Sequence, residues 1–429
     1  MQGPDVEFDG ATTDSREVAP GHLFVPVVAE RDGHDFIGAA LEAGAAAYLT
    51  VGPTAGGTAV VVADTVDALQ AAGRHARGLL PEPVVGITGS VGKTSVKDLL
   101  AAVLATRRRT AASPRSFNNE LGVPLTLLDA PDGTEAVVVE MGARGVGHIA
   151  ALCSIARPTV GIVTRVAAVH TEAFGGLDEV AQAKAELVEA LPASGTAVLN
   201  AADDRVAAMA GRTAATVVTF GAGGDVGAHD VELSPDLRAR FSLHSPWGEG
   251  EVALAVAGRH QVENALAAAA AALAVGLDLA AVQEGLSGAA LSPWRMELVA
   301  TPTGATILND AYNANPTSVL AALDALVDLP ARRRTAVLGV MAELGERAAA
   351  EHTAIGERAR ALGIRLISVA APAYGAPLDV PTLDDALEAL GELDEHDAVL
   401  VKGSRIAGLE RLVVLLIDSG RSARPGMAP

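Results

Sequence analysis

Lysine is scarce in this chain, and one lysine stands where a compact positive charge could do chemistry. The sequence contains four lysines, Lys93, Lys97, Lys184 and Lys402, against 28 arginines. Lys93 lies in the string GITGSVGKTS at residues 86–95, between an apolar stretch that begins at residue 83 and a helical pattern at residues 96–106. A strand, a glycine-rich turn and a helix start, in that order, form the architecture that holds a nucleotide phosphate.

This loop predicts a site for a nucleotide phosphate. Backbone N–H groups and the Lys93 ammonium would hold the phosphate oxygens, and the Thr94 hydroxyl would face a magnesium ion. The pattern departs from a strict Walker motif because Ile87 stands five residues before Gly92, and the alternative is a turn that merely joins a strand to a helix. The predicted phosphate-binding residues are Gly89, Ser90, Gly92, Lys93, Thr94 and Ser95.

A second lysine lies among possible metal ligands. Lys184 falls on the apolar stripe of a helix predicted over residues 178–191, while Glu140 ends one strand and His170 follows another. The carboxyl ends of neighbouring parallel strands converge on the ligand site, so these groups could gather near Thr94. Magnesium accepts a carboxylate or an imidazole, but it accepts a lysine only after loss of the charge, for example by carbamylation. Alternatively, Lys184 keeps its head in water, and His170 packs on the surface.

The order of elements predicts an α/β fold with three domains. A small N-terminal α/β domain at residues 1–80 would contain helices at 35–47 and 66–79 and strands at 46–51 and 59–63. A central domain with a doubly wound, mainly parallel sheet at 81–296 would contain strands at 83–89, 136–141, 160–166 and 196–200, an antiparallel extension at 234–256, and helices at 258–275 and 279–287. A Rossmann-like domain at 297–429 would contain strands at 305–309, 335–340, 365–370 and 398–402, and a frayed tail from residue 418.

Composition excludes several classes of function. The net charge of -20 argues against binding to nucleic acid or to anionic membranes. No uninterrupted apolar run of about 18 residues predicts membrane insertion, and the acidic N-terminus does not resemble a signal peptide, so we expect a cytoplasmic protein. Cys153 is the single cysteine and lies in an apolar string, which indicates a core residue rather than a nucleophile. We expect a monomer.

Together with the phosphate loop, other strings resemble the Mur ligase family, the ATP-dependent amide ligases that build the peptide stem of peptidoglycan. The resemblance covers nearly the whole chain, and the string NDAYNANP at residues 309–316 is the most specific. The others are TDSR at 13–16, PGHLF at 20–24, DGHDF at 32–36, FNNELGVP at 117–124, VEMGA at 139–143, HTE at 170–172, AKAE at 183–186, GRHQVEN at 258–264, MAELG at 341–345 and KGSR at 402–405.

This resemblance implies roles for particular residues. Lys93, Lys184, His170 and Glu140 would be catalytic, with Thr94 and Glu140 on one magnesium ion and His170 with carbamylated Lys184 on a second. Asn264 would contact adenine, and Arg295 and Asp310 would reach the phosphates and ribose. A UDP-muramoyl tripeptide would be held by Ser15, Arg16, Asp32 and His34, and an incoming D-Ala-D-Ala by Asn313, Asn315 and Lys402. From the residues alone, Asn264 could bridge within its helix, Asp310 could begin a turn, and Lys402 could cap a helix.

The expected activity is therefore ATP-dependent amide formation through an acyl phosphate. Arg165, Trp294 and Val340 depart from the family pattern, in which asparagine, a small residue and aspartate are usual at these positions. Since these positions fall near the incoming-substrate regions, the resemblance defines the reaction more firmly than the substrate. A related ligase with another amine substrate is one alternative. A nonenzymatic nucleotide-binding protein of the same fold is another.

Overall fold

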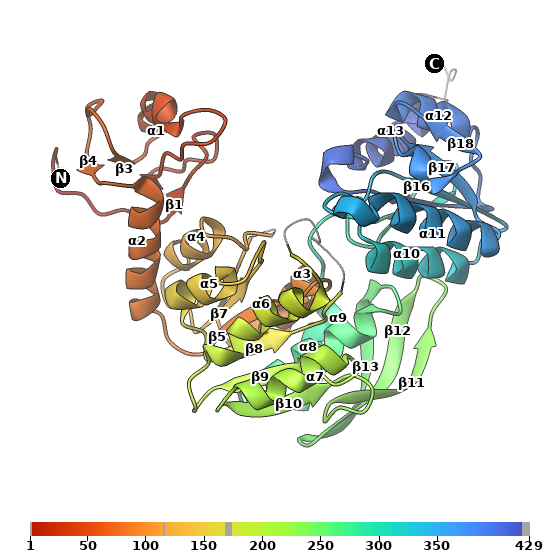
Figure 1. Cartoon of the computed structure of the whole chain (residues 1–429), viewed down its shortest axis with the longest axis horizontal. Coiled ribbons are helices and arrows are strands. Elements are labelled where there is room, and N and C mark those ends of the chain that lie inside the picture. The colour runs from red at the N-terminus through yellow and green to blue at the C-terminus, as the bar shows by residue number, and fades with distance from the viewer. Residues whose placement is uncertain (1, 115, 168–173, 423–429) are drawn as a thin grey trace, which may run out of the picture.

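The chain folds into three lobes along its length, built on four sheets (Figure 1). The computed structural model describes residues 2–114, 116–167 and 174–422. The expected α/β class is confirmed. Within the described part of the chain, every helix is too short or too polar to cross a membrane.

The N-terminal lobe contains four short parallel strands in the order β1-β2-β3-β4. The sheet consists of β1 (Ala11–Thr12), β2 (Leu23–Phe24), β3 (Ala47–Thr50) and β4 (Ala59–Val61), with η1 (Gly33–Phe36), α1 (Ile37–Glu42) and α2 (Thr65–Leu79) beside it. In Figure 1, α2 leads from this lobe toward the middle of the molecule. Its first turn is capped by the Asp64 carboxylate, which accepts hydrogen bonds from two backbone N–H groups.

The middle lobe is built on a six-stranded parallel sheet in the order β10-β9-β8-β5-β7-β6. Its strands are β5 (Val84–Thr88), β6 (Thr110–Ala112), β7 (Ala136–Glu140), β8 (Val160–Val163), β9 (Thr196–Asn200) and β10 (Thr216–Phe220). The chain passes to opposite sides of β5, so the strand order reverses there. A ligand site is expected beyond the carboxyl end of a strand at such a switch point.

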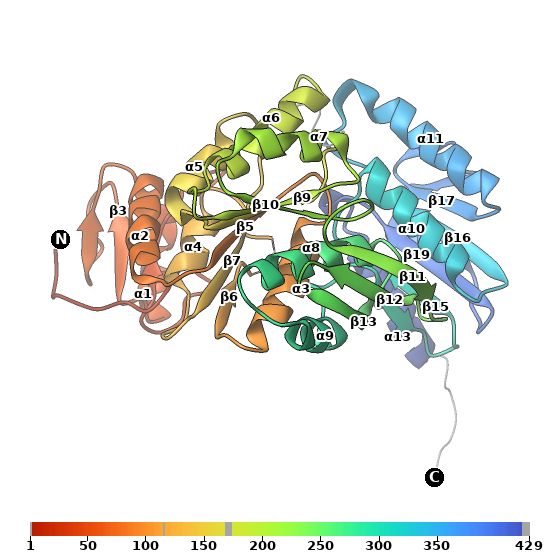
Figure 2. The same cartoon turned by 90° about the horizontal axis from the view of Figure 1, so that it is seen from below.

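Helices cover the sheet of the middle lobe, and a second sheet extends the lobe (Figure 2). The helices are α3 (Lys93–Ala105), α4 (Gly122–Leu128), α5 (His148–Ala156), α6 (Leu177–Glu189), α7 (Asp204–Ala207), η2 (Ala208–Arg212), α8 (Gln261–Ala274) and α9 (Leu279–Gly288). The antiparallel extension expected at 234–256 is confirmed as β12 (Arg238–Ser245) and β13 (Gly248–Ala257), and β11 (Gly227–Leu233) adds a further strand before it. Small residues let the helices approach closely: a Cβ on Gly285 of α9 would lie 2.4 Å from Val103 Cα of α3.

The C-terminal lobe has a six-stranded sheet in the order β14-β15-β19-β16-β17-β18, parallel except for β14. Its strands are β14 (Glu297–Ala300), β15 (Thr306–Asn309), β16 (Arg333–Leu338), β17 (Arg365–Val369), β18 (Leu378–Val380) and β19 (Asp397–Lys402). The helices are α10 (Pro316–Asp328), η3 (Gly345–Arg347), α11 (Ala348–Ala361), η4 (Pro372–Tyr374), α12 (Leu383–Leu390), η5 (Arg405–Ala407) and α13 (Glu410–Ser422).

Several boundaries predicted from the sequence were wrong. The helix expected at 35–47 ends at Glu42, because Gly44 adopts a left-handed φ of 101°. The helix expected at 96–106 begins at Lys93, directly after a left-handed Gly92. The tail expected to fray from residue 418 continues as α13 to Ser422. The strands that were not predicted are β1, β2, β6, β10, β11, β14 and β18.

Candidate active site

The phosphate-type loop follows β5, and two of its glycines are required by geometry. Gly89 has a φ of 148°, and a Cβ there would lie 1.9 Å from Thr164 Oγ1. Gly92 has a φ of 83°, and a Cβ there would lie 2.6 Å from Asn264 Oδ1. The loop therefore turns tightly between β8 and α8 and delivers the chain into the first turn of α3, where unsatisfied N–H groups can bind an anion.

Lys93, the first residue of α3, folds back over this loop. Its Nζ donates a hydrogen bond to the Gly89 carbonyl over 2.8 Å. Burial lowers the pKa of Lys93, with Glu140 opposing this shift and Arg295 adding to it. A buried ammonium that bonds only weakly basic carbonyl oxygen is suited to gain an anionic partner such as a phosphate.

Thr94 and Glu140 form the oxygen-rich centre of the site. Parallel pairing of β5 with β7 sets Ile87 opposite Glu140, which brings the Glu140 carboxylate to the loop. Thr94 Oγ1 donates to Glu140 Oε2 over 2.6 Å, and Asn118 Nδ2 donates to Glu140 Oε1 over 2.9 Å. The prediction that Glu140 lies near Thr94 is confirmed.

The donor set at Thr94 and Glu140 fits a magnesium ion. A hydroxyl and a carboxylate are hard oxygen ligands of the kind that magnesium accepts, with its other positions filled by water and phosphate oxygens. The described residues contain no cluster of three or more His, Cys, Asp or Glu side chains that could hold a metal by themselves. A site with these two oxygen ligands suits an ion that arrives with a nucleotide.

Lys184 is buried in α6 beside this centre, with 3% of its surface exposed. The alternative in which its head stays in water is therefore wrong. Burial, with a further contribution from the nearby charge of Lys93, lowers the pKa of Lys184 to about 7. Lys184 lines a cavity of about 160 Å³, whose wall includes Lys93, Asn118, Arg144 and His148. An amine with this pKa is substantially neutral near pH 7, which is the form that can react with carbon dioxide.

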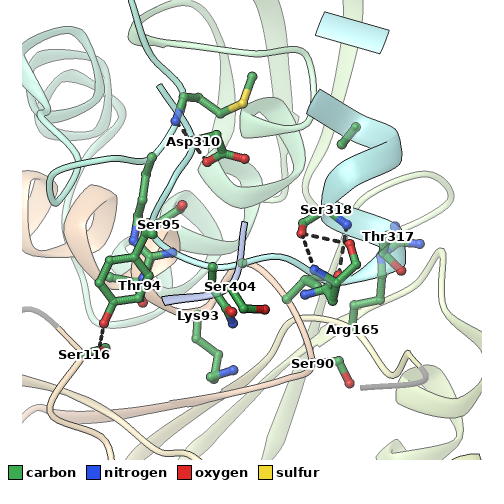
Figure 3. A pocket seen from close by; sticks show the side chains of 18 of the residues that line it. Ser90, Lys93, Thr94, Ser95, Ser116, Arg165, Asp310, Thr317, Ser318 and Ser404 are labelled. Carbon is green, nitrogen blue, oxygen red and sulfur yellow. Dashed lines mark hydrogen bonds between the residues drawn. The ribbon is translucent and has the colours of Figure 1, made fainter. Parts of the chain in front are cut away.

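A larger cavity of about 720 Å³ lies between the middle and C-terminal lobes (Figure 3). Lys93 and Thr94 line it from the start of α3, and Asp310, Ser318 and Ser404 line it from the C-terminal lobe. Most of the residues predicted for ATP and amine binding are thus brought together. Those on its wall are Ser90, Gly92, Lys93, Thr94, Ser95, Glu140, Asn264, Arg295, Asp310, Asn313, Asn315 and Lys402.

Arg295 reaches the phosphate loop from the segment that joins the middle and C-terminal lobes. Its Nη2 donates to Thr94 Oγ1 over 2.9 Å, and its guanidinium lies 4.1 Å from the ring centroid of Tyr312. Its Nε is buried without a hydrogen-bond partner among the described residues. A guanidinium held over an aromatic ring, with a donor still unpaired, is well placed to donate hydrogen bonds to phosphate oxygens.

On the opposite wall, Lys402 ends β19 and joins two of the predicted residues. Its Nζ donates to Asp310 Oδ2 and, over 2.8 Å, to the Asn313 carbonyl. The Asp310 carboxylate also accepts a hydrogen bond from Met296 N over 3.1 Å. Lys402 therefore ties β19 to the 309–316 string, and the alternative of a helix cap is wrong. Asn315 instead is the cap, because its side chain accepts from Ser318 N at the start of α10.

On the nucleotide side, Asn264 and Arg165 lie beside the phosphate loop. Asn264 Nδ2 donates to Gln261 Oε1 within α8 over 2.8 Å, so the expected bridge within its helix is present. Its Oδ1 remains directed at Gly92, as the 2.6 Å approach to a hypothetical Cβ shows. Arg165 forms a forked ion pair with Glu263, 2.8 Å to each carboxylate oxygen, and its carbonyl accepts from Ser90 N.

The predicted uridine-nucleotide residues lie in the N-terminal lobe, outside both cavities. Ser15 and Arg16 occupy the segment between β1 and β2, and hydrogen bonds from Arg16 lower the pKa of Asp14 to about 2. Asp32 caps η1, and its carboxylate contacts His34 Nδ1 at 2.6 Å. Arg16 and Asp32 are exposed at the surface of the lobe, and Ser15 and His34 are partly buried.

Some residues of the site were not predicted from the sequence or lie outside the described part of the chain. His170 lies outside the described residues. Asn118, which donates to Glu140, and Tyr312, which stacks on Arg295 and contacts the Ser116 hydroxyl, were not assigned a role. Both residues fall inside strings that carry the family resemblance, at 117–124 and 309–316. The sequence therefore marked these strings, but it did not show which side chains the two residues contact.

Comparisons with known proteins agree with this geometry. Residues 87–272 match the Mur ligase middle domain, and residues 294–405 match the Mur ligase glutamate ligase domain. The UDP-N-acetylmuramoyl-tripeptide--D-alanyl-D-alanine ligase of Mycobacterium tuberculosis is 41% identical over 484 residues, which cover 98% of this chain and 94% of the relative.

Solved structures give the same result. MurF from Acinetobacter baumannii superimposes with a TM-score of 0.88 at 31% identity, covering 97% of this chain and 95% of that one. MurF from Thermotoga maritima in complex with ADP gives 0.85 at 28% identity, covering 97% and 98%. A phosphate-loop sheet joined to a second α/β lobe across a polar cavity defines an ATP-dependent ligase architecture. The chain belongs to the Mur ligase family.

Proposed function

We propose that this chain is an ATP-dependent peptide ligase that joins D-alanyl-D-alanine to UDP-N-acetylmuramoyl-tripeptide in peptidoglycan precursor synthesis. The observation that carries the proposal is the gathering of Lys93, Thr94, Glu140 and Arg295 opposite Asp310 and Lys402 around one cavity. The relatives named for this reaction match almost the entire chain, which favours this amine substrate over another.

The reaction then proceeds in two balanced steps. The terminal carboxylate oxygen of the tripeptide attacks the γ-phosphorus of ATP, and the bond from that phosphorus to the β–γ bridging oxygen breaks, which releases ADP and leaves an acyl phosphate. The amine nitrogen of the dipeptide attacks the acyl carbon, the carbon–oxygen bond to phosphate breaks, and the amine loses a proton as phosphate departs.

The residues of the chain supply charge and position for these steps. Lys93 and Arg295 would bind the transferring phosphate, and Thr94 with Glu140 would hold one magnesium ion. Bound magnesium neutralises phosphate charge that otherwise repels the attacking carboxylate. We propose that carbamylated Lys184, with His170, holds a second ion, supported by the burial of Lys184 and its pKa of about 7. Asn264 would bind adenine, and Ser15, Arg16, Asp32 and His34 the uridine nucleotide.

The three lobes suggest that each substrate binds to a different part of the chain. We propose that residues 1–80 bind the UDP-muramoyl peptide, 81–296 bind ATP, and 297–429 bind the amine substrate. Each of these segments contains its own sheet, since α2 ends at Leu79, β5 begins at Val84 and β14 begins at Glu297. The expected monomer and the expected cytoplasmic location stay predictions.

The test is product formation from purified components. ATP, a UDP-muramoyl tripeptide with either lysine or diaminopimelate as third residue, and D-Ala-D-Ala are mixed, and phosphate and peptide product are both measured. We expect turnover only when all three substrates are present, because the acyl phosphate needs a carboxylate to form and an amine to resolve it. ATP hydrolysis at the same rate without the tripeptide nucleotide would identify a simple ATPase instead.

A further inference from the structure

Trp294 has an unusual backbone conformation in the segment that joins the middle and C-terminal lobes. Its φ is 62°, in the left-handed region that bulky residues avoid, and Met296 two residues later has a φ of 53°. The Trp294 carbonyl accepts a hydrogen bond from Tyr312 N over 3.2 Å, which fixes this conformation against the 309–316 string. A small residue would adopt this conformation more easily, so we look for a contact of the tryptophan side chain that offsets the backbone strain.

The indole ring of Trp294 supports an arginine. Its face lies under the guanidinium of Arg405, whose Cζ is 4.5 Å from the ring centroid. The tryptophan packs against the apolar cluster between the C-terminal sheet and its helices, which includes Ile307 and Leu409. A fixed aromatic face attracts the cation and limits its rotamers, so Arg405 is held in one place.

Arg405 retains hydrogen-bonding capacity on the cavity wall. Its Nη1 contacts Glu410 Oε1 at 2.9 Å, and 55% of its side chain is exposed. Among the described residues Glu410 is the only carboxylate paired with it, and the second Glu410 oxygen, Oε2, has no hydrogen-bond partner. A guanidinium has five N–H donors in a planar fork, so donors remain for a ligand carboxylate.

Lys402, a second cation on this wall, already has hydrogen-bond partners within the protein. Lys402 donates to Asp310 and to the Asn313 carbonyl, so its charge holds the wall together. Ile406, next to Arg405, also lines the cavity and is 79% exposed. A guanidinium with unused N–H donors beside an exposed apolar side chain matches a carboxylate that carries a methyl group on the adjacent carbon.

We propose that Arg405 binds the free carboxylate of the incoming dipeptide and that Trp294 is its positioning residue. The inference rests on the proposed function, because it assumes a dipeptide amine substrate. It assigns the strained tryptophan, a departure from the family pattern, to the recognition of that substrate. Binding of the carboxylate at Arg405 would leave the amine end directed into the cavity toward the phosphate loop.

The decisive experiment compares D-Ala-D-Ala with D-alanyl-D-alaninamide, which lacks the carboxylate charge. In the unmodified chain we expect kcat/KM for the acid to exceed that for the amide by at least about 100-fold, because the amide would leave the Arg405 guanidinium without a charged partner. Arg405→Ala should raise KM for the acid and reduce this preference to about tenfold or less, with KM for ATP unchanged.

Trp294 variants test the positioning role. Trp294→Gly relieves the backbone strain but loses the packing of the indole, so its folding is checked by its unfolding midpoint; in the folded protein it should raise KM for D-Ala-D-Ala by about three- to fivefold with little change in kcat. Trp294→Phe keeps an aromatic face and should stay within about twofold of the unmodified chain. Adding Trp294→Gly to Arg405→Ala should raise KM no further, because the tryptophan acts through the arginine.

Each outcome separates this inference from the proposed function. Absence of dipeptide ligation by the unmodified chain would remove the function and, with it, the inference. Ligation with an acid-to-amide preference that survives Arg405→Ala would overturn the inference alone. An equal rise in KM for ATP and for the dipeptide in Trp294→Gly would show that the tryptophan is merely structural.

Discussion

Two buried amines, Lys93 and Lys184, lie close enough at the centre of the site for the charge of Lys93 to affect Lys184. Burial lowers the pKa of both, and the charge of Lys93 further lowers that of Lys184. One ammonium is therefore favoured beside the phosphate loop rather than two. Lys93, which bonds the Gly89 carbonyl and heads α3, is the one placed for phosphate.

Lys93→Arg should abolish most of the activity without unfolding the protein. A planar guanidinium does not fit a site closed by Gly89 and Thr164, so we expect kcat/KM for ATP to fall by at least about 100-fold. The unfolding midpoint should change little, because Lys93 contributes a single, partly buried hydrogen bond to the Gly89 carbonyl. Lys97 in the same helix is the matched control: it is buried, pairs with Asp98 at 2.7 Å and donates to the Ser113 carbonyl. Lys97→Met should lower the midpoint while the Kd for ATP stays nearly constant.

Lys184 should make folding stability depend on pH. Its folded pKa of about 7 lies below the unfolded value of 10.5, so between these values the unfolded chain binds more protons. The free energy of unfolding should therefore rise with pH from about 7 to about 10.5, and the Lys184 contribution should be constant below that window. Denaturant titrations in CO2-free buffer measure this directly.

The difference between the unmodified chain and Lys184→Met isolates the lysine from other titrating groups. The rise in the free energy of unfolding between about pH 7 and 10.5 that is due to Lys184 should be absent from Lys184→Met. Adding bicarbonate should stabilise only the chain that contains Lys184. Identical slopes in the two proteins would show that the buried amine does not titrate in this range. A stabilisation by bicarbonate in both would argue against a carbamate at Lys184.

At the scale of elements, the sequence predicts what local pattern determines. Valine-rich runs located β5, β7 and β9 to within about one residue, because strands of a parallel sheet are buried on both faces. The three residues of β6 carry too little pattern to stand out, and β10 is an edge strand recognised by its pairing with β9. The contact of Asn118 with Glu140 joins residues on different elements, so no local pattern reports it.

The start of α10 links an element boundary to the site. The Asn315 side chain accepts from Ser318 N, the Ser318 hydroxyl accepts from Asn315 N, and both residues line the cavity. Asn315→Ala should lower the free energy of unfolding by about 1 kcal/mol through loss of the cap. It should also raise KM for D-Ala-D-Ala, because the first turn of α10 forms part of the wall.

A cap in the same lobe but away from the cavity provides the control. Thr382 caps α12 by accepting from Asp385 N over 3.2 Å, and it does not line the cavity. Thr382→Ala should cost similar stability, about 1 kcal/mol, and leave the KM for both substrates unchanged. If both substitutions shift KM equally, the effect of Asn315→Ala is general destabilisation rather than a change in the site.

At the scale of the whole molecule, the cavity exists because the middle and C-terminal lobes meet. The Tyr312 hydroxyl contacts the Ser116 hydroxyl across the two lobes, and Arg295, which stacks on the same tyrosine, reaches Thr94. An acyl phosphate is lost to hydrolysis if water enters, so closure of the lobes must outlast the time that the amine needs to attack. Contacts that favour closure therefore set how efficiently ATP is converted into peptide.

Tyr312→Phe should loosen closure while keeping the ring under Arg295. Loss of one hydrogen bond across the lobes should reduce the closed population by about fivefold. The measurement is the number of phosphates released per peptide bond formed, which should be one in the unmodified chain and clearly above one in the variant.

Ser116→Ala should give the same excess of phosphate, and the double variant should give no more, because both substitutions remove the same contact. Small-angle X-ray scattering with ADP bound should show a larger radius of gyration in both variants. A stoichiometry of one in both would mean that Tyr312 and Ser116 do not control closure, and that the Arg295 contact with Thr94 suffices to hold the lobes together.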